Sequence, residues 1–245
     1  MSDNYICPIC NSEVDSFLPL PDYYLEQLLK FGGSVDFDNR ETLNWRNYSC
    51  PNCNATDRDR LYALYLNFRF VQSPRTAEKQ LFIDFAPSKP LSGYIRTLLD
   101  ISYFTVDIAM SGVDYHADIT NLSMLNDDSV DFFICSHVFE HVSDDRKALS
   151  ELLRILKSSG QGILMVPIQL NAISIDEDPA ETSEAERWRR FGQGDHIRSY
   201  SKRGFVERVL DSGLKLTAYG INSFGAETFR RSGITPQSVL YITSR

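Results

Sequence analysis

The sequence has few positive charges and no long apolar run. Its 245 residues hold 25 Lys and Arg against 33 Asp and Glu, which gives a net charge of −8. Nucleic-acid affinity comes largely from Lys and Arg that displace counterions, so this balance argues against a nucleic-acid partner. No apolar stretch is long enough to cross a bilayer, and the polar residues 1–5 do not begin a signal peptide. We therefore expect a soluble, cytoplasmic protein without membrane contact.

Cysteine is also scarce, with five residues in all, and four of them form two Cys-x-x-Cys pairs. Each pair presents two thiolates from a tight turn, which suits half of a tetrahedral zinc site. Free thiols or a single redox pair are the alternatives, but two matched pairs, each with proline after its first cysteine, favour zinc. The predicted ligands are Cys7, Cys10, Cys50 and Cys53. Four cysteines leave no open coordination position, so the predicted Zn²⁺ is structural. The fifth, Cys135, lies in an apolar strand and is expected to be a core residue.

Composition divides the chain into three parts. Residues 1–56 hold both cysteine pairs and many turn formers, and we expect a small zinc-ribbon-like module with four cysteine ligands there. A short helix is predicted within it at residues 23–31. Thr56 is a good N-cap for a connecting helix within residues 57–79. The main domain is predicted to occupy residues 80–245.

In the main domain, short apolar runs alternate with helical patterns. Residues 130–135 are almost wholly apolar, as in a strand buried on both faces. Residues 148–156 carry the apolar stripe of a helix, for which Ser143 is a candidate cap. Such alternation predicts a parallel sheet with helices on both faces, while the short loop 222–236 favours an antiparallel last pair. The predicted fold is α/β, a doubly wound Rossmann-like seven-stranded sheet whose last strand is antiparallel. Its strands are expected at 81–85, 103–108, 115–119, 130–135, 162–168, 215–221 and 239–243, with further helices at 91–99 and 201–212.

Three acidic residues follow successive predicted strands: Asp84, Asp107 and Asp118. Ligands of doubly wound sheets bind at the carboxyl ends of the strands, and an acid after the second strand is well placed to bind ribose hydroxyls. Each acid alone is more often a turn residue or a helix cap than a ligand-binding residue. Together they predict a ligand site along this edge of the sheet.

The most specific motif spans residues 131–142, Asp-Phe-Phe-Ile-Cys-Ser-His-Val-Phe-Glu-His-Val. A predicted helix follows and ends in Leu-Lys-Ser-Ser-Gly at residues 156–160. This part resembles the central signature of class I S-adenosylmethionine-dependent methyltransferases of the type 11-like kind, and the resemblance covers residues 80–245. The segments 50–61 and 191–198, the second reading Phe-Gly-Gln-Gly-Asp-His-Ile-Arg, resemble a bacterial subgroup in which a zinc-ribbon-like segment precedes that domain.

The resemblance implies an S-adenosylmethionine site. Asp84 matches the acid that opens the first cofactor loop, and Asp107 matches the ribose-binding acid. Asp118 and Ile119 match the pair beside the adenine, while Ser136 follows the fourth strand, where the methionine end and the substrate meet. The first loop departs from the usual pattern because it carries no glycine. Its small residues, Ala86 and Ser88, are the candidates for close approach to the cofactor.

Two histidines are candidate bases. His137 belongs to the acid-His turn. His196 ends a charged insertion at about residues 170–200, which is predicted to be a lid, and its neighbour Asp195 is expected to accompany it towards the pocket. His137 and His141 are four residues apart, but the pattern is not His-Glu-x-x-His and the same turn occurs in methyltransferases without metal. We therefore expect a structural role for His141.

The leading hypothesis is methyl transfer from S-adenosylmethionine to an oxygen or nitrogen of a small-molecule acceptor, with His196 or His137 as base. A second hypothesis is an RNA methyltransferase in which the zinc module grips the target, and the net charge argues against it. A third is a non-catalytic binding or scaffold protein, suggested by the glycine-free first loop. The sequence makes no prediction of oligomeric state.

Overall fold

A seven-stranded mixed sheet organises the computed structural model, which describes residues 4–72 and 78–245. The strand order is β11-β12-β7-β6-β3-β4-β5. Strand β12 runs antiparallel to both its neighbours, and every other pair in the sheet is parallel, so the predicted topology is confirmed. The strands are β3 (Gln80–Phe85), β4 (Ile101–Asp107), β5 (Tyr115–His116), β6 (Val130–Ser136), β7 (Leu156–Met165), β11 (Lys215–Tyr219) and β12 (Leu240–Ser244).

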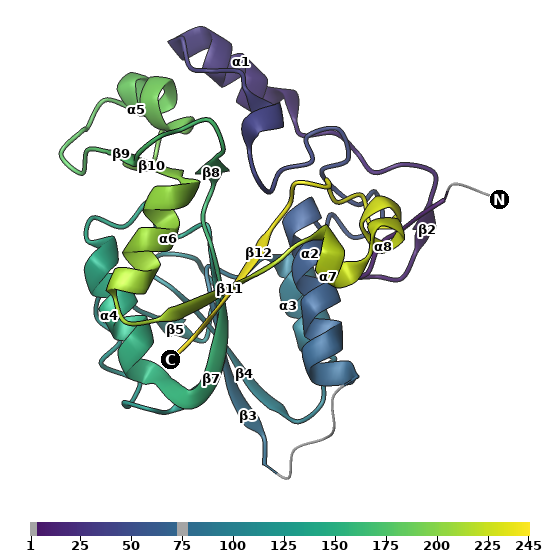
Figure 1. Ribbon diagram of the computed structural model, residues 1–245, viewed down its shortest axis with the longest axis vertical. Helices are drawn as coiled ribbons and strands as arrows, with labels where there is room; N and C mark the ends of the chain where they lie inside the picture. The colour runs from purple at the N-terminus through teal and green to yellow at the C-terminus, as the bar shows by residue number, and fades with distance from the viewer. Residues whose placement is uncertain (1–3, 73–77) are drawn as a thin grey trace.

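Helices cover both faces of the sheet. Figure 1 shows α4 (Asp145–Ile155) and α6 (Lys202–Asp211) on one face, with α2 (Asp57–Leu66) and α3 (Lys89–Ile95) on the other. Buried apolar side chains from the helices and the strands form one large core. Helix α2 is buried on almost every side and continues into a π-helical turn, Asn67–Val71. The doubly wound arrangement is therefore as predicted.

Some element boundaries differ from the predictions. Helix α4 is capped by Asp144 rather than Ser143, because the Asp144 carboxylate accepts the backbone N–H of Lys147. The helix ends at Ile155. Leu156 is the first residue of β7 and pairs with Val130 of β6, so the apolar pattern used for the prediction extends beyond the end of the helix. The loop expected at residues 222–236 contains two short helices, α7 (Ile221–Phe224) and α8 (Ala226–Arg231).

The N-terminal segment wraps against the main domain. It contains the hairpin of β1 (Tyr5–Ile6) and β2 (Glu13–Val14), helix α1 (Asp22–Phe31) and a 3₁₀ turn, Phe37–Asn39. One side chain, Arg60 at the start of α2, is fully buried and stacks on the ring of Phe17, with 3.8 Å between guanidinium carbon and ring centroid. Its guanidinium donates to five backbone carbonyls, those of Asn47, Tyr48, Ala55, Ser232 and Gly233. Arg60 therefore joins the N-terminal segment, α2 and the C-terminal segment.

The insertion predicted as a lid folds into a small subdomain. It consists of α5 (Glu184–Phe191) and a three-stranded sheet of β8 (Ile168–Gln169), β9 (Asp176–Glu177) and β10 (Arg198–Ser201). Helix α5 packs against α1, and the buried Trp188 ring contacts two aromatic rings of α1, those of Tyr23 and Phe31. Figure 1 shows these two helices together above the sheet. The N-terminal segment and the insertion therefore pack against each other.

Candidate active site

The strand order of the sheet reverses between β3 and β6, and ligands of doubly wound sheets bind at such a switch point. Ala86 follows β3 and His137 follows β6. Both have left-handed backbones, with φ of 51° and 57°. A non-glycine residue in this region costs roughly 1–3 kcal/mol, and such residues cluster at functional sites. Three adjoining cavities open at this point.

Cavity A has a volume of about 470 Å³ and lies at the ends of β3, β4 and β5. Four of the predicted cofactor residues line it: Ala86, Asp107, Asp118 and Ile119. One oxygen of the Asp107 carboxylate accepts the backbone N–H groups of Ala109 and Met110, each at 2.7 Å. These bonds hold the carboxylate at the strand end, where its second oxygen can bind a hydroxyl.

Cavity B, about 230 Å³, lies beside the glycine-free loop. The other predicted cofactor residues line it: Asp84, Ser88 and Ser136, with Ala86 shared with cavity A. Asp84 is 1% exposed and accepts a 2.6 Å hydrogen bond from the Tyr103 hydroxyl. Burial raises the pKa of Asp84 to about 7, although this hydrogen bond opposes the shift.

The start of α2 supplies the opposite wall of cavity B, and its residues were not predicted to belong to the site. Arg58, Asp59 and Tyr62 line the cavity. The Ser88 hydroxyl donates to Asp59 at 2.7 Å, and the Tyr62 and Ser136 hydroxyls are hydrogen-bonded at 2.7 Å. The charged run at residues 57–60 could have indicated these residues, because four charged side chains in one turn of a largely buried helix need polar partners.

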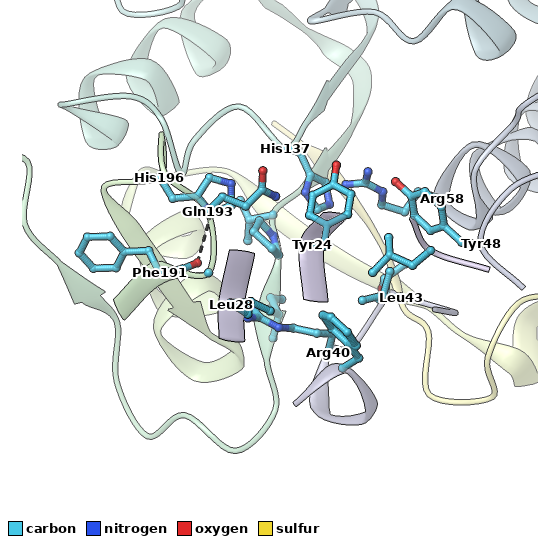
Figure 2. Close-up of a pocket in the computed structure, with 17 residues that line it drawn as sticks. Tyr24, Leu28, Arg40, Leu43, Tyr48, Arg58, His137, Phe191, Gln193 and His196 are labelled. Atoms are coloured by element: carbon cyan, nitrogen blue, oxygen red, sulfur yellow. Dashed lines mark hydrogen bonds between the residues drawn. The ribbon is translucent and has the colours of Figure 1, made fainter. Parts of the chain in front are cut away.

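Cavity C, about 110 Å³, lies between the N-terminal segment and the insertion. Figure 2 shows Arg40, Tyr48 and Arg58 approaching it from one side and residues of the 191–196 segment from the other. No acidic side chain is among its lining residues in the described chain. The cavity is therefore electropositive within an acidic protein.

His137 lines all three cavities. Its Nδ1 lies 3.2 Å from Oε1 of Glu140, whose side chain is fully buried. Burial lowers the pKa of His137 to about 4, and the nearby Arg58 guanidinium lowers it further while Glu140 opposes the change. His137 is thus a neutral imidazole at the junction of the three cavities.

His196 lines cavity C but is only 3% exposed. Its Nδ1 lies 3.3 Å from the carbonyl oxygen of Phe191, and burial lowers its pKa. Asp195 does not accompany His196 to cavity C, contrary to the expectation. The Asp195 carboxylate is exposed and faces His141, with 3.5 Å between Oδ2 and Nδ1. Asp195 lies in the exposed turn between α5 and β10, whereas His196 is buried against the Phe191 carbonyl.

The Asp-His-Ile-Arg motif fixes the turn after β6. Arg198 is buried and donates to the carbonyls of Phe139 and Val142. The backbone N–H of Ile197 donates to the carbonyl of Glu140 at 2.9 Å. Strand β10 therefore positions the His137–His141 turn, although the two segments lie far apart in the sequence.

The four cysteines of the predicted zinc site come together. The Sγ atoms of Cys7 and Cys53 are 3.7 Å apart, those of Cys10 and Cys50 are 3.9 Å apart, and all four lie within 4.8 Å of one another. Zn–S bonds of about 2.3 Å at tetrahedral angles place neighbouring sulfurs about 3.8 Å apart. The cluster therefore fits zinc, while Cys135 is buried in β6 as expected.

The sheet topology defines a Rossmann-like α/β domain, and cavities lie at the strand ends beside its switch point. Residues 89–164 match the family model of a methyltransferase domain. This match and the sheet topology agree with the S-adenosylmethionine-dependent methyltransferase domain that the resemblance implied.

The solved structures that the chain matches have low sequence identity to it. The SAM-dependent methyltransferase from Archaeoglobus fulgidus is 13% identical, with 91% of this chain and 100% of that chain covered and a TM-score of 0.47. The [4+2]-cyclase SpnF is 11% identical, covering 93% and 97%, with a TM-score of 0.49. The YcgJ protein from Bacillus subtilis is 17% identical, covering 73% and 96%, with a TM-score of 0.44. No curated protein sequence matches the chain. No helix in the described ranges is long and apolar enough to span a membrane.

Proposed function

We propose that the protein transfers a methyl group from S-adenosylmethionine to an oxygen or nitrogen of a small anionic acceptor. The observation that supports this most directly is the position of His137. The cavities lined by the predicted cofactor residues and the electropositive cavity C all adjoin its side chain. A cofactor in A and B and an acceptor in C would therefore meet beside one imidazole.

The cofactor residues divide between the two cavities. In cavity A, Asp107 would bind the ribose hydroxyls, and Asp118 and Ile119 would flank the adenine. In cavity B, Ser136 and the loop from Asp84 to Ser88, including Ala86, would hold the methionine end. When bound, the cofactor supplies an electrophilic methyl group. The protein contributes mainly alignment of acceptor, methyl and sulfur.

Cavity C favours an acceptor with a carboxylate or phosphate group. Arg40 and Arg58 both line it, and guanidinium groups bind such groups in a bidentate manner. Burial lowers the pKa of Arg40, which an anionic partner would reverse. A net charge of −8 would repel an RNA backbone, whereas a small anion can enter an arginine-lined cavity.

His137 is the preferred base and His196 the alternative. His137 adjoins all three cavities and is neutral, so a ring nitrogen can accept the acceptor's proton. His196 lines cavity C but has one nitrogen against the Phe191 carbonyl. The zinc proposed at the four cysteines is structural, because all its coordination positions are filled by the chain.

Calorimetric titration with S-adenosylmethionine tests the cofactor assignment. The wild-type protein is expected to bind, and Asp107→Asn to lose most of the affinity. Asp211→Asn at the end of α6 is the matched control and should bind normally. Absence of binding to the wild type would support the scaffold hypothesis and overturn the proposal.

The acceptor assignment is tested with labelled cofactor and a panel of small hydroxy and amino acids, each paired with its neutral amide. Label is expected on the acids only, and less of it in Arg40→Ala. Transfer to RNA instead would overturn the acceptor class but leave methyl transfer intact.

A further inference from the structure

A second group of potential metal ligands lies at the junction of the cavities. It consists of Glu140, His141 and His196, and one ligand atom from each lies within 4.8 Å of the others. Glu140 and His141 come from the turn after β6, and His196 comes from the segment before β10. The rings of His141 and His196 are in contact although 55 residues separate them in the sequence. The two imidazoles and the carboxylate are brought together by the hydrogen bonds from Ile197 and Arg198 to the turn after β6.

Glu140 is the least satisfied group of the three. Its side chain is fully buried, and neither carboxylate oxygen has a hydrogen-bond partner of acceptable geometry in the described chain. Nδ1 of His137 lies 3.2 Å from Oε1 and partly balances the charge, but Oε2 has no hydrogen-bond partner in the described chain. Burying an ionised carboxylate with a single histidine contact is costly, and native proteins pair such groups more fully or place them on a metal.

The two histidines are oriented as metal ligands usually are. His196 Nδ1 lies 3.3 Å from the Phe191 carbonyl oxygen, and His141 Nδ1 lies 3.3 Å from the Asp195 carbonyl oxygen. A carbonyl accepts hydrogen bonds only, so each Nδ1 carries the proton and each Nε2 carries a lone pair. Metal-ligating histidines typically donate their other ring nitrogen to such an acceptor.

With the proton on Nδ1, Nε2 of His196 is a hydrogen-bond acceptor that faces another acceptor, the Glu140 carboxylate. Nε2 of His196 lies 4.0 Å from Oε1 of Glu140. A lone pair and a carboxylate oxygen repel, whereas a cation between them satisfies both. Two metal–ligand bonds of about 2.1 Å at a tetrahedral angle place their ligand atoms about 3.4 Å apart, so the gap must close by roughly 0.6 Å when the metal binds.

We propose that Glu140, His141 and His196 bind a divalent transition-metal ion, separate from the zinc at the four cysteines. Two imidazoles and a carboxylate suit Fe²⁺, Co²⁺, Ni²⁺ or Zn²⁺, and three protein ligands leave coordination positions open. His141 lines cavity A and His196 lines cavity C, so the open positions face the space between them. An acceptor oxygen can bind there. Binding of an acceptor oxygen rests on the proposed function, whereas binding of the metal does not.

Metal counting tests the site without any methyl-transfer assay. Zinc-loaded protein is treated with a mild chelator and titrated with Co²⁺ by calorimetry, and zinc and cobalt are then counted by elemental analysis after gel filtration. One bound cobalt per chain is expected in addition to one zinc. Loss of even an outer-shell partner costs about 10–100-fold in metal affinity, so His141→Ala and His196→Ala should each lose more.

The controls separate the site from the fold and from the cysteines. His116→Ala removes an exposed histidine on β5 and should bind cobalt normally. His141 is half-exposed, so its substitution keeps the test valid if His196→Ala fails to fold. Cys50→Ser is expected to lose zinc but keep cobalt. Absence of cobalt beyond the cysteine site, or binding unchanged in both histidine variants, would refute the second metal site.

Discussion

The hydroxyl of Tyr103 donates a 2.6 Å hydrogen bond to the buried carboxylate of Asp84. The two residues belong to neighbouring parallel strands, β4 and β3, and the Tyr103 oxygen accepts a 2.8 Å hydrogen bond from the Ser92 hydroxyl of α3. Asp84 is the acid that opens the loop between β3 and α3, so this contact fixes the base of the proposed cofactor loop. Since burial raises the pKa of Asp84 to about 7, the carboxyl group changes its charge near neutral pH.

The raised pKa predicts a specific pH dependence of stability. Between about pH 4 and pH 7, Asp84 ionises in the unfolded chain but stays protonated in the folded one, so the unfolded state binds fewer protons. The contribution of Asp84 to the unfolding free energy is complete below about pH 4 and is lost as pH rises through about 7. The expected slope approaches about 1.4 kcal/mol per pH unit.

The measurement is urea unfolding of wild type and Asp84→Asn at several pH values from 5 to 7. Asparagine imitates the protonated acid, so the stability difference between the two proteins isolates Asp84 and cancels contributions from zinc and histidines. A difference that does not change with pH would contradict the raised pKa. Tyr103→Phe removes a bond that holds the pKa down and should extend the slope to higher pH.

The fold was predictable because its signals are local. Apolar runs such as residues 130–135 and the stripe on α4 mark buried strands and helices without knowledge of the rest of the chain. The antiparallel last strand followed from a loop too short for a crossover. Boundaries such as the end of α4 failed because Leu156 is apolar in either element, and only its pairing with Val130 decides.

The site was predictable only in part. The residues after β3, β4 and β6 follow from the rule that ligands lie at strand ends, and Ala86, Asp107 and Ser136 do line the cavities. Arg58 and Glu140 were missed, since their importance depends on contacts across long sequence separations. The contact of Asp195 with His141 likewise depends on the turn before β10, which brings together residues 54 apart in the sequence.

The cysteine cluster predicts one zinc ion that stabilises the N-terminal segment. Cys50→Ser is expected to lose zinc and to lower the melting temperature by several degrees, because the ligands and the N-terminal hairpin are held by the metal. Cys135→Ala is the control: its thiol is buried in β6, far from the cluster in sequence, and zinc should be retained. Elemental analysis and thermal unfolding measure both effects. Full zinc content in Cys50→Ser would contradict the predicted ligand set.

Arg60 is predicted to be one of the most important residues for stability. Its fully buried guanidinium donates to carbonyls from three separate segments, and hydrogen bonds from charged groups contribute about 1.5–3 kcal/mol each. Arg60→Met should therefore cost more than about 3 kcal/mol in urea unfolding, since it also leaves buried carbonyls unpaired. Arg203→Ala is the matched control, because its exposed ion pair with Glu207 should change stability by less than about 1 kcal/mol. Equal losses in the two variants would refute this role.

The backbone conformation of Ala86 leads to a prediction about the stability and cofactor binding of the glycine-free first loop. Its φ of 51° is a conformation that glycine adopts freely, while Ala is strained in it and a β-branched residue is strained more. Ala86→Gly relieves the strain, but it also adds about 0.4–1 kcal/mol of entropy to the unfolded state. Its net effect on stability should thus be small, and binding of S-adenosylmethionine should be kept. Ala86→Val should lower both, because its branched side chain fits neither the backbone nor the cavities that Ala86 lines. Calorimetry and urea unfolding of the two variants decide, and a Val variant equal to the Gly variant would show that the backbone at this position does not control the loop.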